Sequence, residues 1–353
     1  MLQTKEAKEE IAETVEPPAP TVIGWQGVRF KLPPEWNVTG FSLDRSNGYI
    51  RVDSPGAGTM SVQVRWSSAG ANENAPPTPY YMLAPYFRKW LRRSPPPVAP
   101  TDLKANLEKV LKDAARDARK RKTNFDSQMK PQRLEGERGE RTAINFTWTG
   151  AGRGQGKIWK CDTCSRVVVA QVIGMPRDHN AMGTVASQLF GTFEDHPTDG
   201  FDLWALYDLR ASIPIEFTLQ SHKLMSGHLQ LVFSRGAERI VLDRWGLANV
   251  TLKKFTDDEW LRNNALCRLD GMEKRRETMA IGHDGALFQG ALPAGGRMFA
   301  FREAKGSLRR FPTRYTGGVW HCPDSNKLFA IQMLHNRHTE GLWEQVLQKC
   351  LCH

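Results

Sequence analysis

The pattern in this chain with the most reactive side chains is a pair of cysteines two residues apart, Cys161-Asp162-Thr163-Cys164. It follows Trp159 and precedes the apolar run Val167–Val172, so we expect it in the turn of a β-hairpin. Two thiolates in such a turn are half of a structural zinc site, which takes four ligands. The C-terminus offers candidates for the other half, namely Cys350, Cys352 and His353.

Two other roles remain open for this cysteine pair. A redox pair gains its low pKa from a helix N-terminus, and the sequence predicts no helix after Cys164. Buried core thiols are the interpretation that we favour, because residues two apart in a strand share one face. The later segment Trp320-His321-Cys322 repeats Trp159 and Cys161 but has Ser325 where Cys164 stands. We therefore expect no cofactor, with zinc at Cys161 and Cys164 as the alternative.

A second chemical feature is a run of basic residues within 88–122. A basic helical face can follow a nucleic-acid backbone, each phosphate contact adding to the salt dependence of binding. The other interpretation is a solvated or protein-facing surface with internal ion pairs, such as Asp117 with Arg121. The candidate polyanion-binding residues are Arg88, Lys89, Arg92, Arg93, Lys112, Arg116, Arg119, Lys120, Arg121 and Lys122.

Other familiar catalytic patterns are absent from the sequence. The glycine-rich segment 150–157 resembles a phosphate-binding loop, but Ile158 replaces the required Ser or Thr and a strand is expected after it. The nine histidines form no HxxxH or HExxH pattern. These observations favour a protein without enzymatic activity, although a site assembled from distant residues is not visible in a sequence.

Charge and composition restrict the class of protein further. The 353 residues carry a net charge of +11, while the first twenty residues are acidic and end in prolines. A basic body attracts polyanions, and an acidic, proline-rich end is typical of a disordered tail. No apolar run is long enough for a spanning helix and the N-terminus lacks a secretory signal, so we expect a cytoplasmic protein.

Segments from the two halves of the chain resemble each other in sequence. Residues 48–69 align without a gap with 227–248, which places Trp66 opposite Trp245. Upstream, Leu32-Pro33 and Trp36 match Ile213-Pro214 and Phe217. Several matches in the same order indicate an internal duplication. We expect an acidic tail over 1–20, a first repeat over 21–196 with inserted basic helices, and a second repeat over 197–353.

Each repeat is predicted to contain strands, then helices, then strands, then a closing helix. In the first repeat, helices are expected over 80–93 and 103–122, with a strand in which Ile144, Phe146 and Trp148 alternate. In the second, Thr256 is expected to cap a helix, and strands are expected over 276–281, 285–292 and 297–302. The predicted fold class is α+β, with two tandem α/β sandwich units, each a mainly antiparallel sheet flanked by helices.

This order of elements, with the Leu32-Pro33…Trp36 and Ile213-Pro214…Phe217 segments, resembles the Mog1/PsbP-like α/β/α family. The resemblance implies binding or scaffolding rather than catalysis. Our leading hypothesis is therefore a non-enzymatic binding or scaffold protein whose partner is another protein or assembly. The alternative is a nucleic-acid-binding protein that uses the 88–122 helices.

Overall fold

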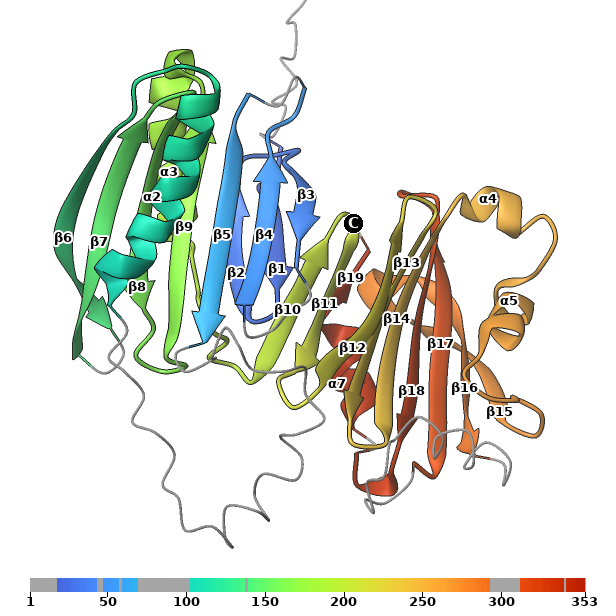
Figure 1. Ribbon diagram of the computed structural model, residues 1–353. Coiled ribbons are helices and arrows are strands. Elements are labelled where there is room, and N and C mark those ends of the chain that lie inside the picture. Colours follow the sequence, from blue (N-terminus) through green and yellow to red (C-terminus); the bar gives the residue numbers. More distant parts are fainter. Residues whose placement is uncertain are drawn as a thin grey trace, which may run out of the picture.

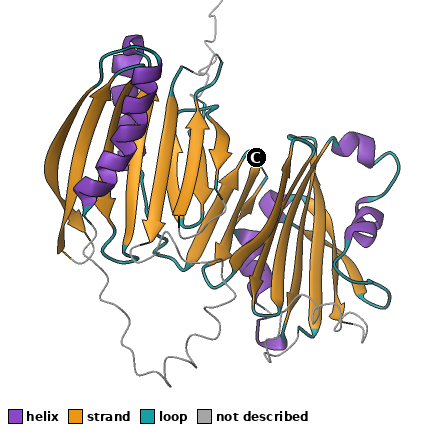
Figure 2. Cartoon of the chain, in the orientation of Figure 1, coloured by secondary structure: helices purple, strands orange, loops and turns teal. Residues whose placement is uncertain are grey.

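The structure is a computed structural model that describes residues 18–42, 47–56, 59–68, 102–136, 139–292, 312–339 and 341–352. Three antiparallel sheets contain most of these residues, with helices lying against them (Figure 1). Strands account for far more of the chain than helices do (Figure 2). The acidic segment 1–17, the helix expected over 80–93 and the strand expected over 297–302 lie outside the described residues.

The first seven-stranded sheet belongs to the first repeat. Its strands run in the order β3-β4-β5-β9-β8-β7-β6. Their bounds are β3 Asn37–Phe41, β4 Asn47–Asp53, β5 Ser61–Ser68, β6 Asp126–Gly136, β7 Gly139–Thr149, β8 Arg153–Lys160 and β9 Arg166–Gly174. Pro131 is tolerated in β6 because this strand is at the edge of the sheet.

The second seven-stranded sheet follows the same path. Its order is β12-β13-β14-β18-β17-β16-β15, so each strand has a counterpart in the first sheet, as a duplication predicts. A β-bulge recurs at the same place, after Val38 in β3 and after Leu219 in β12. The bounds are β12 Thr218–Met225, β13 His228–Arg235, β14 Glu238–Gly246, β15 Glu273–Thr278, β16 Asp284–Ala291, β17 Arg314–Cys322 and β18 Lys327–His335.

The third sheet joins the two repeats. Its order is β19-β11-β10-β1-β2, and the β1–β2 hairpin meets the β10–β11 hairpin where Gly24 lies opposite Ala205. Each outer hairpin strand also pairs with the segment that follows the closing helix of its own repeat. Glu194 bridges to Arg29 of β2, and Leu351 pairs with Arg210 of β11. The bounds are β1 Thr21–Trp25, β2 Val28–Leu32, β10 Phe201–Leu206, β11 Leu209–Pro214 and β19 Cys350–Leu351.

Helices pack on both sides of the seven-stranded sheets. Helix α2 (Leu103–Lys120) buries Leu107 and Leu111 against β7 and β8, on the face to which Phe146 and Trp148 point. Helix α3 (His179–Gly191) contacts β2 and β9, and α7 (Leu342–Gln348) contacts β11. The apolar residues that α3 and α7 bury against the sheets belong to one core that extends through both repeats, whereas those under α2 form a separate cluster.

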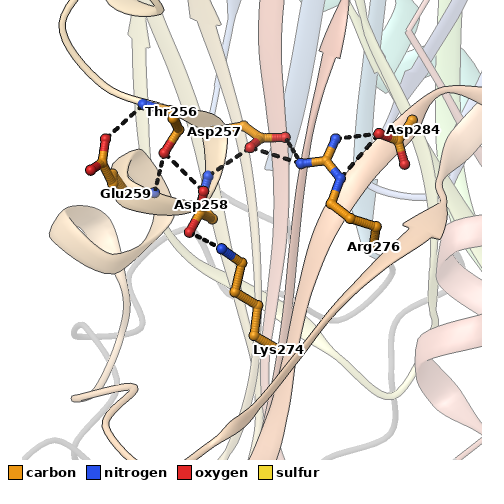
Figure 3. Close-up of polar contacts among 7 residues, drawn as sticks. All are labelled: Thr256, Asp257, Asp258, Glu259, Lys274, Arg276 and Asp284. Atoms are coloured by element: carbon orange, nitrogen blue, oxygen red, sulfur yellow. Dashed lines mark hydrogen bonds and ion pairs between the residues drawn. The ribbon is translucent and has the colours of Figure 1, made fainter.

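Two short helices take the place of α2 in the second repeat. These are α4 (Ala248–Thr251) and α5 (Asp257–Asn264), and α5 buries Trp260 and Leu261. As the sequence predicts, Thr256 caps α5. Its hydroxyl accepts a hydrogen bond from the backbone amide of Glu259, and the Glu259 carboxylate accepts one from the backbone amide of Thr256, which together form a capping box (Figure 3).

Ion pairs fasten this capped end of α5 to β15 (Figure 3). Arg276 of β15 binds both oxygens of Asp257, at 2.9 and 2.7 Å, and also pairs with Asp284. Lys274 pairs with Asp258. Burial acts to raise the pKa of Asp258, but hydrogen bonds from Lys274 and Thr256 outweigh it, so the pKa lies below its ordinary value. The network orients α5 over the sheet.

The predicted fold class is wrong in one essential respect. The protein is dominated by antiparallel strands in three sheets and does not consist of two separate helix-flanked α/β sandwiches. The reason is that the hairpins β1–β2 and β10–β11 leave the main sheets and pair with each other. Nothing in a local pattern of alternating residues says which strand a hairpin edge will pair with.

The ungapped alignment of the two repeats is also wrong in register. In the first sheet, Trp66 of β5 lies opposite Val168 of β9. The counterpart of Val168 in the second sheet is Phe329 of β18, and the residue opposite Phe329 is Arg244 of β14. Trp245 points to the other face, where its ring meets Trp260 edge to face at 5.6 Å. The turn between β4 and β5 is longer than the turn between β13 and β14, which shifts the register. Arg244, and not Trp245, therefore occupies the place of Trp66.

Candidate functional site

The basic residues predicted to bind polyanions fall into two groups. Arg88, Lys89, Arg92 and Arg93 lie outside the described residues. The other six lie on α2 or directly after its end, and all are exposed: Lys112, Arg116, Arg119, Lys120, Arg121 and Lys122.

Part of the charge of α2 is neutralised by its own acidic residues. Arg121 lies 3.6 Å from Asp117, and Arg116 lies 3.5 Å from Asp113, which also faces Arg65 of β5 at 3.7 Å. All of these side chains are largely exposed, where an ion pair contributes about 0–1 kcal/mol. The helix thus presents a hydrated basic surface.

A groove with a volume of about 440 Å³ is bounded by β1, β3, the β10–β11 turn, β12, β13 and β14. Its lining residues come from both repeats: Thr21, Val22, Ile23, Trp36, Asn37, Val38, Tyr207, Asp208, Leu224, Met225, Ser226, Leu229 and Arg244. We refer to this feature as the inter-repeat groove.

Arg244 is the buried charged residue of the inter-repeat groove, with 6% of its surface exposed. Its Nη2 donates to Asp208 Oδ2 at 2.7 Å, and its Nη1 donates to the carbonyl of Ser226 at 3.1 Å. Its Nε is buried and has no hydrogen-bond partner among the described residues. A guanidinium with one buried N–H left without an acceptor bears the desolvation cost of that group, about 1–3 kcal/mol.

Asp208 connects Arg244 to a second cation. Lys327 Nζ lies 2.5 Å from Asp208 Oδ2, the oxygen that also accepts from Arg244. Burial acts to raise the pKa of Asp208, but hydrogen bonds from Lys327 and Arg244 outweigh it, so the pKa lies below its ordinary value. Two cations with one carboxylate leave a net charge of +1 beside the inter-repeat groove.

The sides of the inter-repeat groove are partly formed by edge strands. Within the described residues, β3 pairs with β4 alone and β12 with β13 alone, so each has a free backbone edge. The two edges approach where Phe41 of β3 meets His222 of β12, at 5.9 Å between ring centroids. Tyr207 and Met225 stand at the rim and are 49% and 58% exposed.

The predicted cysteine pair forms a different cluster. Cys161 is buried after β8, Cys164 is exposed in the turn before β9, and His196 joins them from the segment after α3. Cys161 Sγ lies 3.3 Å from His196 Nδ1, and the same nitrogen lies 2.8 Å from Asp195 Oδ1. Trp159 Nε1 donates to Asp195 Oδ2 at 2.6 Å.

The two thiols of this cluster have pKa values shifted in opposite directions. A hydrogen bond from Cys161 lowers the pKa of Cys164 to about 6, with help from the Arg166 amide and charge. The pKa of Cys161 is raised, first by this same hydrogen bond and then by burial. The cluster therefore has the donor atoms of a metal site, with one sulfur already favoured as the thiolate.

The C-terminal cysteines do not complete this cluster. Cys352 groups with Cys322 and His283, in a second set whose donor atoms lie close enough to hold a metal ion. Burial first, and then the hydrogen bond with Cys322, raise the pKa of Cys352 to about 12. The expectation that C-terminal residues would supply the missing ligands to Cys161 and Cys164 is wrong for Cys352, because β19 carries it into the second repeat; His353 lies outside the described residues.

Several residues of these sites are not evident from the sequence, among them His196, Asp195 and Arg244. His196 and Asp195 lie more than thirty residues after Cys164 in the chain, and contacts of the segment after α3 with β2 and β8 place them beside the cysteines. Arg244 was hidden by the shifted alignment, which paired it with Arg65. An alignment that allowed a gap in the β4–β5 turn would have placed Arg244 at the Trp66 position.

Comparisons with known proteins add little to this description. No protein-family model matches the chain, and no curated protein matches it. None of the helices in the described part of the chain is long and apolar enough to cross a membrane. Among solved structures, the chain is similar to cyanobacterial PsbP (CyanoP) from Synechocystis sp. PCC 6803, with a TM-score of 0.32 and 6% identity over 53% of this chain and 98% of that chain.

Proposed function

We propose that this protein is a non-enzymatic binding protein that holds an extended polypeptide segment in the inter-repeat groove. The observation that carries the proposal is Arg244, a buried arginine that lines the groove and whose Nε has no acceptor among the described residues. This Nε is covered in the structure, so we propose that a small shift of the Arg244 side chain on binding brings it to an acidic side chain or a C-terminal carboxylate of the partner. Charge-assisted hydrogen bonds of this kind are about twice as strong as neutral ones.

The shape of the groove favours an extended partner. The free edges of β3 and β12 offer backbone donors and acceptors, and a peptide that adds a strand to such an edge gains affinity from its main chain. Tyr207 and Met225 offer apolar surface at the rim, which suits an apolar side chain of the partner. The preferred ligand is therefore an extended peptide with one carboxylate and a neighbouring apolar residue.

Divergence between the repeats supports the same site. At the position of Trp66 in the first repeat, the second repeat has Arg244. Burial of a charged side chain costs desolvation free energy unless partners compensate it. An apolar residue there would fill the core as Trp66 does. The exchange of a core tryptophan for an arginine that lines the groove is what we expect of a ligand-binding position.

A selection with displayed random peptides tests this proposal. Enriched peptides are synthesised and titrated by fluorescence anisotropy against the wild type and against Arg244→Met, which keeps a similar volume without the charge. We expect Arg244→Met to weaken binding about tenfold or more, as loss of a charged hydrogen bond of about 1.5–3 kcal/mol requires. Tyr207→Ala, at an exposed position, is expected to weaken it without affecting folding.

The control is Arg51→Met, which removes another ion-paired arginine that does not line the inter-repeat groove. The proposal fails if no peptide is enriched, or if the enriched peptides bind Arg244→Met and Arg51→Met equally well. Reproducible turnover of any substrate by the purified protein would also overturn it.

Nucleic-acid binding is a second candidate function, and one observation favours it. The six candidate basic residues that the structure describes in the α2 region are all exposed, and they extend over the last turns of the helix and beyond its end. Such a surface attracts phosphate backbones without reading sequence. The internal ion pairs with Asp113 and Asp117 reduce this attraction, which is why we place peptide binding first.

A further inference from the structure

We infer that the turn after β8 and the segment after α3 form a zinc site in which Cys161, Cys164 and His196 are ligands. The three donor atoms lie within 4.8 Å of one another. Two thiolates and an imidazole are soft and borderline donors, a set that selects zinc over the hard cations that prefer oxygen.

The spacing of the donors fits a tetrahedral ion. With Zn–S of about 2.3 Å and Zn–N of about 2.0 Å, a tetrahedron separates sulfur from nitrogen by ~3.5 Å. Cys161 Sγ and His196 Nδ1 are 3.3 Å apart. The pair is thus already at the distance that a shared metal ion would impose.

Two acceptors converge on one ring nitrogen of His196. Cys161 Sγ and Asp195 Oδ1 lie 3.3 and 2.8 Å from the same Nδ1. A single N–H can point well at only one of them, whereas a cation at this point attracts the lone pairs of the nitrogen, the sulfur and the oxygen together. Asp195 is itself held in place by the Trp159 indole, so it orients His196 beside the sulfurs.

The surroundings of the sulfurs resemble an outer ligand shell. The amide of Cys164 donates to Cys161 Sγ at 3.4 Å, and the positive charge of Arg166 acts on Cys164. Amide donors and a nearby cation both stabilise thiolates, and partners of this kind orient and tune metal ligands. Arg166 also donates to the carbonyl of Gln26 at 2.8 Å, which ties this turn to the β1–β2 turn.

The position of the site gives it a role beyond peptide binding. Cys161 and Cys164 belong to the β8–β9 turn of the first repeat, whereas His196 belongs to the segment that leads into β10 of the second. A bound ion would fasten this connecting segment to the first repeat, and so would hold the third sheet in register. The second repeat lacks the exposed cysteine, because Ser325 stands in its place.

The test is elemental analysis of the full chain after reconstitution with zinc under reducing conditions and removal of free metal. We expect the wild type to hold about one equivalent more zinc than Cys164→Ser or His196→Asn, since structural zinc binds tightly. Because the difference is measured, metal at the His283, Cys322 and Cys352 cluster does not affect the result. Cobalt substitution should give the visible bands of a tetrahedral thiolate complex in the wild type but not in Cys164→Ser.

The matched control is Cys267→Ser, which removes a thiol outside both clusters and is expected to retain the metal. Cys164 is exposed, so its replacement by Ser leaves the core intact, and circular dichroism of the variant verifies this. Zinc contents that are equal in the wild type and Cys164→Ser, or a wild type that takes up no zinc, would overturn the inference.

Discussion

The indole of Trp66 lies directly over Gly48 on the neighbouring strand. A Cβ added to Gly48 would fall 1.7 Å from Cε2 of this ring, so β4 can pass Trp66 only with glycine at this position. Gly227, which the ungapped alignment pairs with Gly48, has no atom within 4 Å of such a Cβ. The two glycines therefore have different roles.

Gly48→Ala is expected to destabilise the protein by about 2–3 kcal/mol, because overpacking displaces the Trp66 ring from the core. Gly227→Ala should change the free energy of unfolding by less than about 0.5 kcal/mol, as surface substitutions do. Urea unfolding of both variants measures this. Equal effects of the two substitutions would contradict the register described here.

Gly24→Ala is expected to weaken the joint between the repeats. Its Cβ would lie 2.5 Å from the carbonyl oxygen of Leu203, where β1 and β10 meet, and a backbone atom cannot move aside cheaply. We expect a loss of about 2–3 kcal/mol. Gly183→Ala is the control, because this helical glycine has open space and alanine favours a helix by about 1 kcal/mol. Thermal melts should shift in opposite directions for the two variants.

Asp208→Asn tests the ion pairs beside the inter-repeat groove. The pKa of Asp208 lies below its ordinary value, so its contribution to stability is present at neutral pH and is lost as the pH falls through the folded-state pKa. Because Asp208 is half exposed, we expect a loss of about 1 kcal/mol at pH 7. Urea unfolding at pH 7 and at successively lower pH should show the difference between wild type and variant shrink as the medium becomes acidic. A difference that is the same at every pH value would assign the effect to packing.

Replacement of Arg119, Lys120, Arg121 and Lys122 by serine tests the basic surface. If all four contact phosphates, wild-type affinity for duplex DNA should fall about 100-fold between 50 and 200 mM salt, and the variant should lose most of this dependence. Lys253→Ser with Lys254→Ser is the charge control, because both lysines are exposed on the second repeat. Fluorescence titration with RNA and with duplex DNA provides the measurement. Unchanged affinity in the fourfold variant would exclude these residues as the contact.

The local elements were largely predictable from sequence. The apolar stripe of α2, the Thr256 cap of α5 and the alternation of Ile144, Phe146 and Trp148 are set by nearest neighbours, and the structure has all three. These features follow from helix and strand periodicity alone.

Long-range pairing was not predictable in the same way. The contact of β1 with β10 and the approach of His196 to Cys161 depend on which edges meet, and no local pattern records that choice. The alignment error at Arg244 has the same origin, because a change in turn length alters register and moves a side chain to the opposite face. The candidate sites lie where such pairings bring distant residues together, which is why the sequence reached them only in part.

The seam at Gly24 and Ala205 has a further consequence. Two hairpins on separate molecules would have to find each other at the concentration of the protein in solution, and a short seam of this kind would not hold them. On one chain, the connection through 192–200 keeps the hairpins at an effective concentration in the millimolar range, so a short seam is enough. Because both hairpins belong to one chain, the two halves need not be identical for the seam to form.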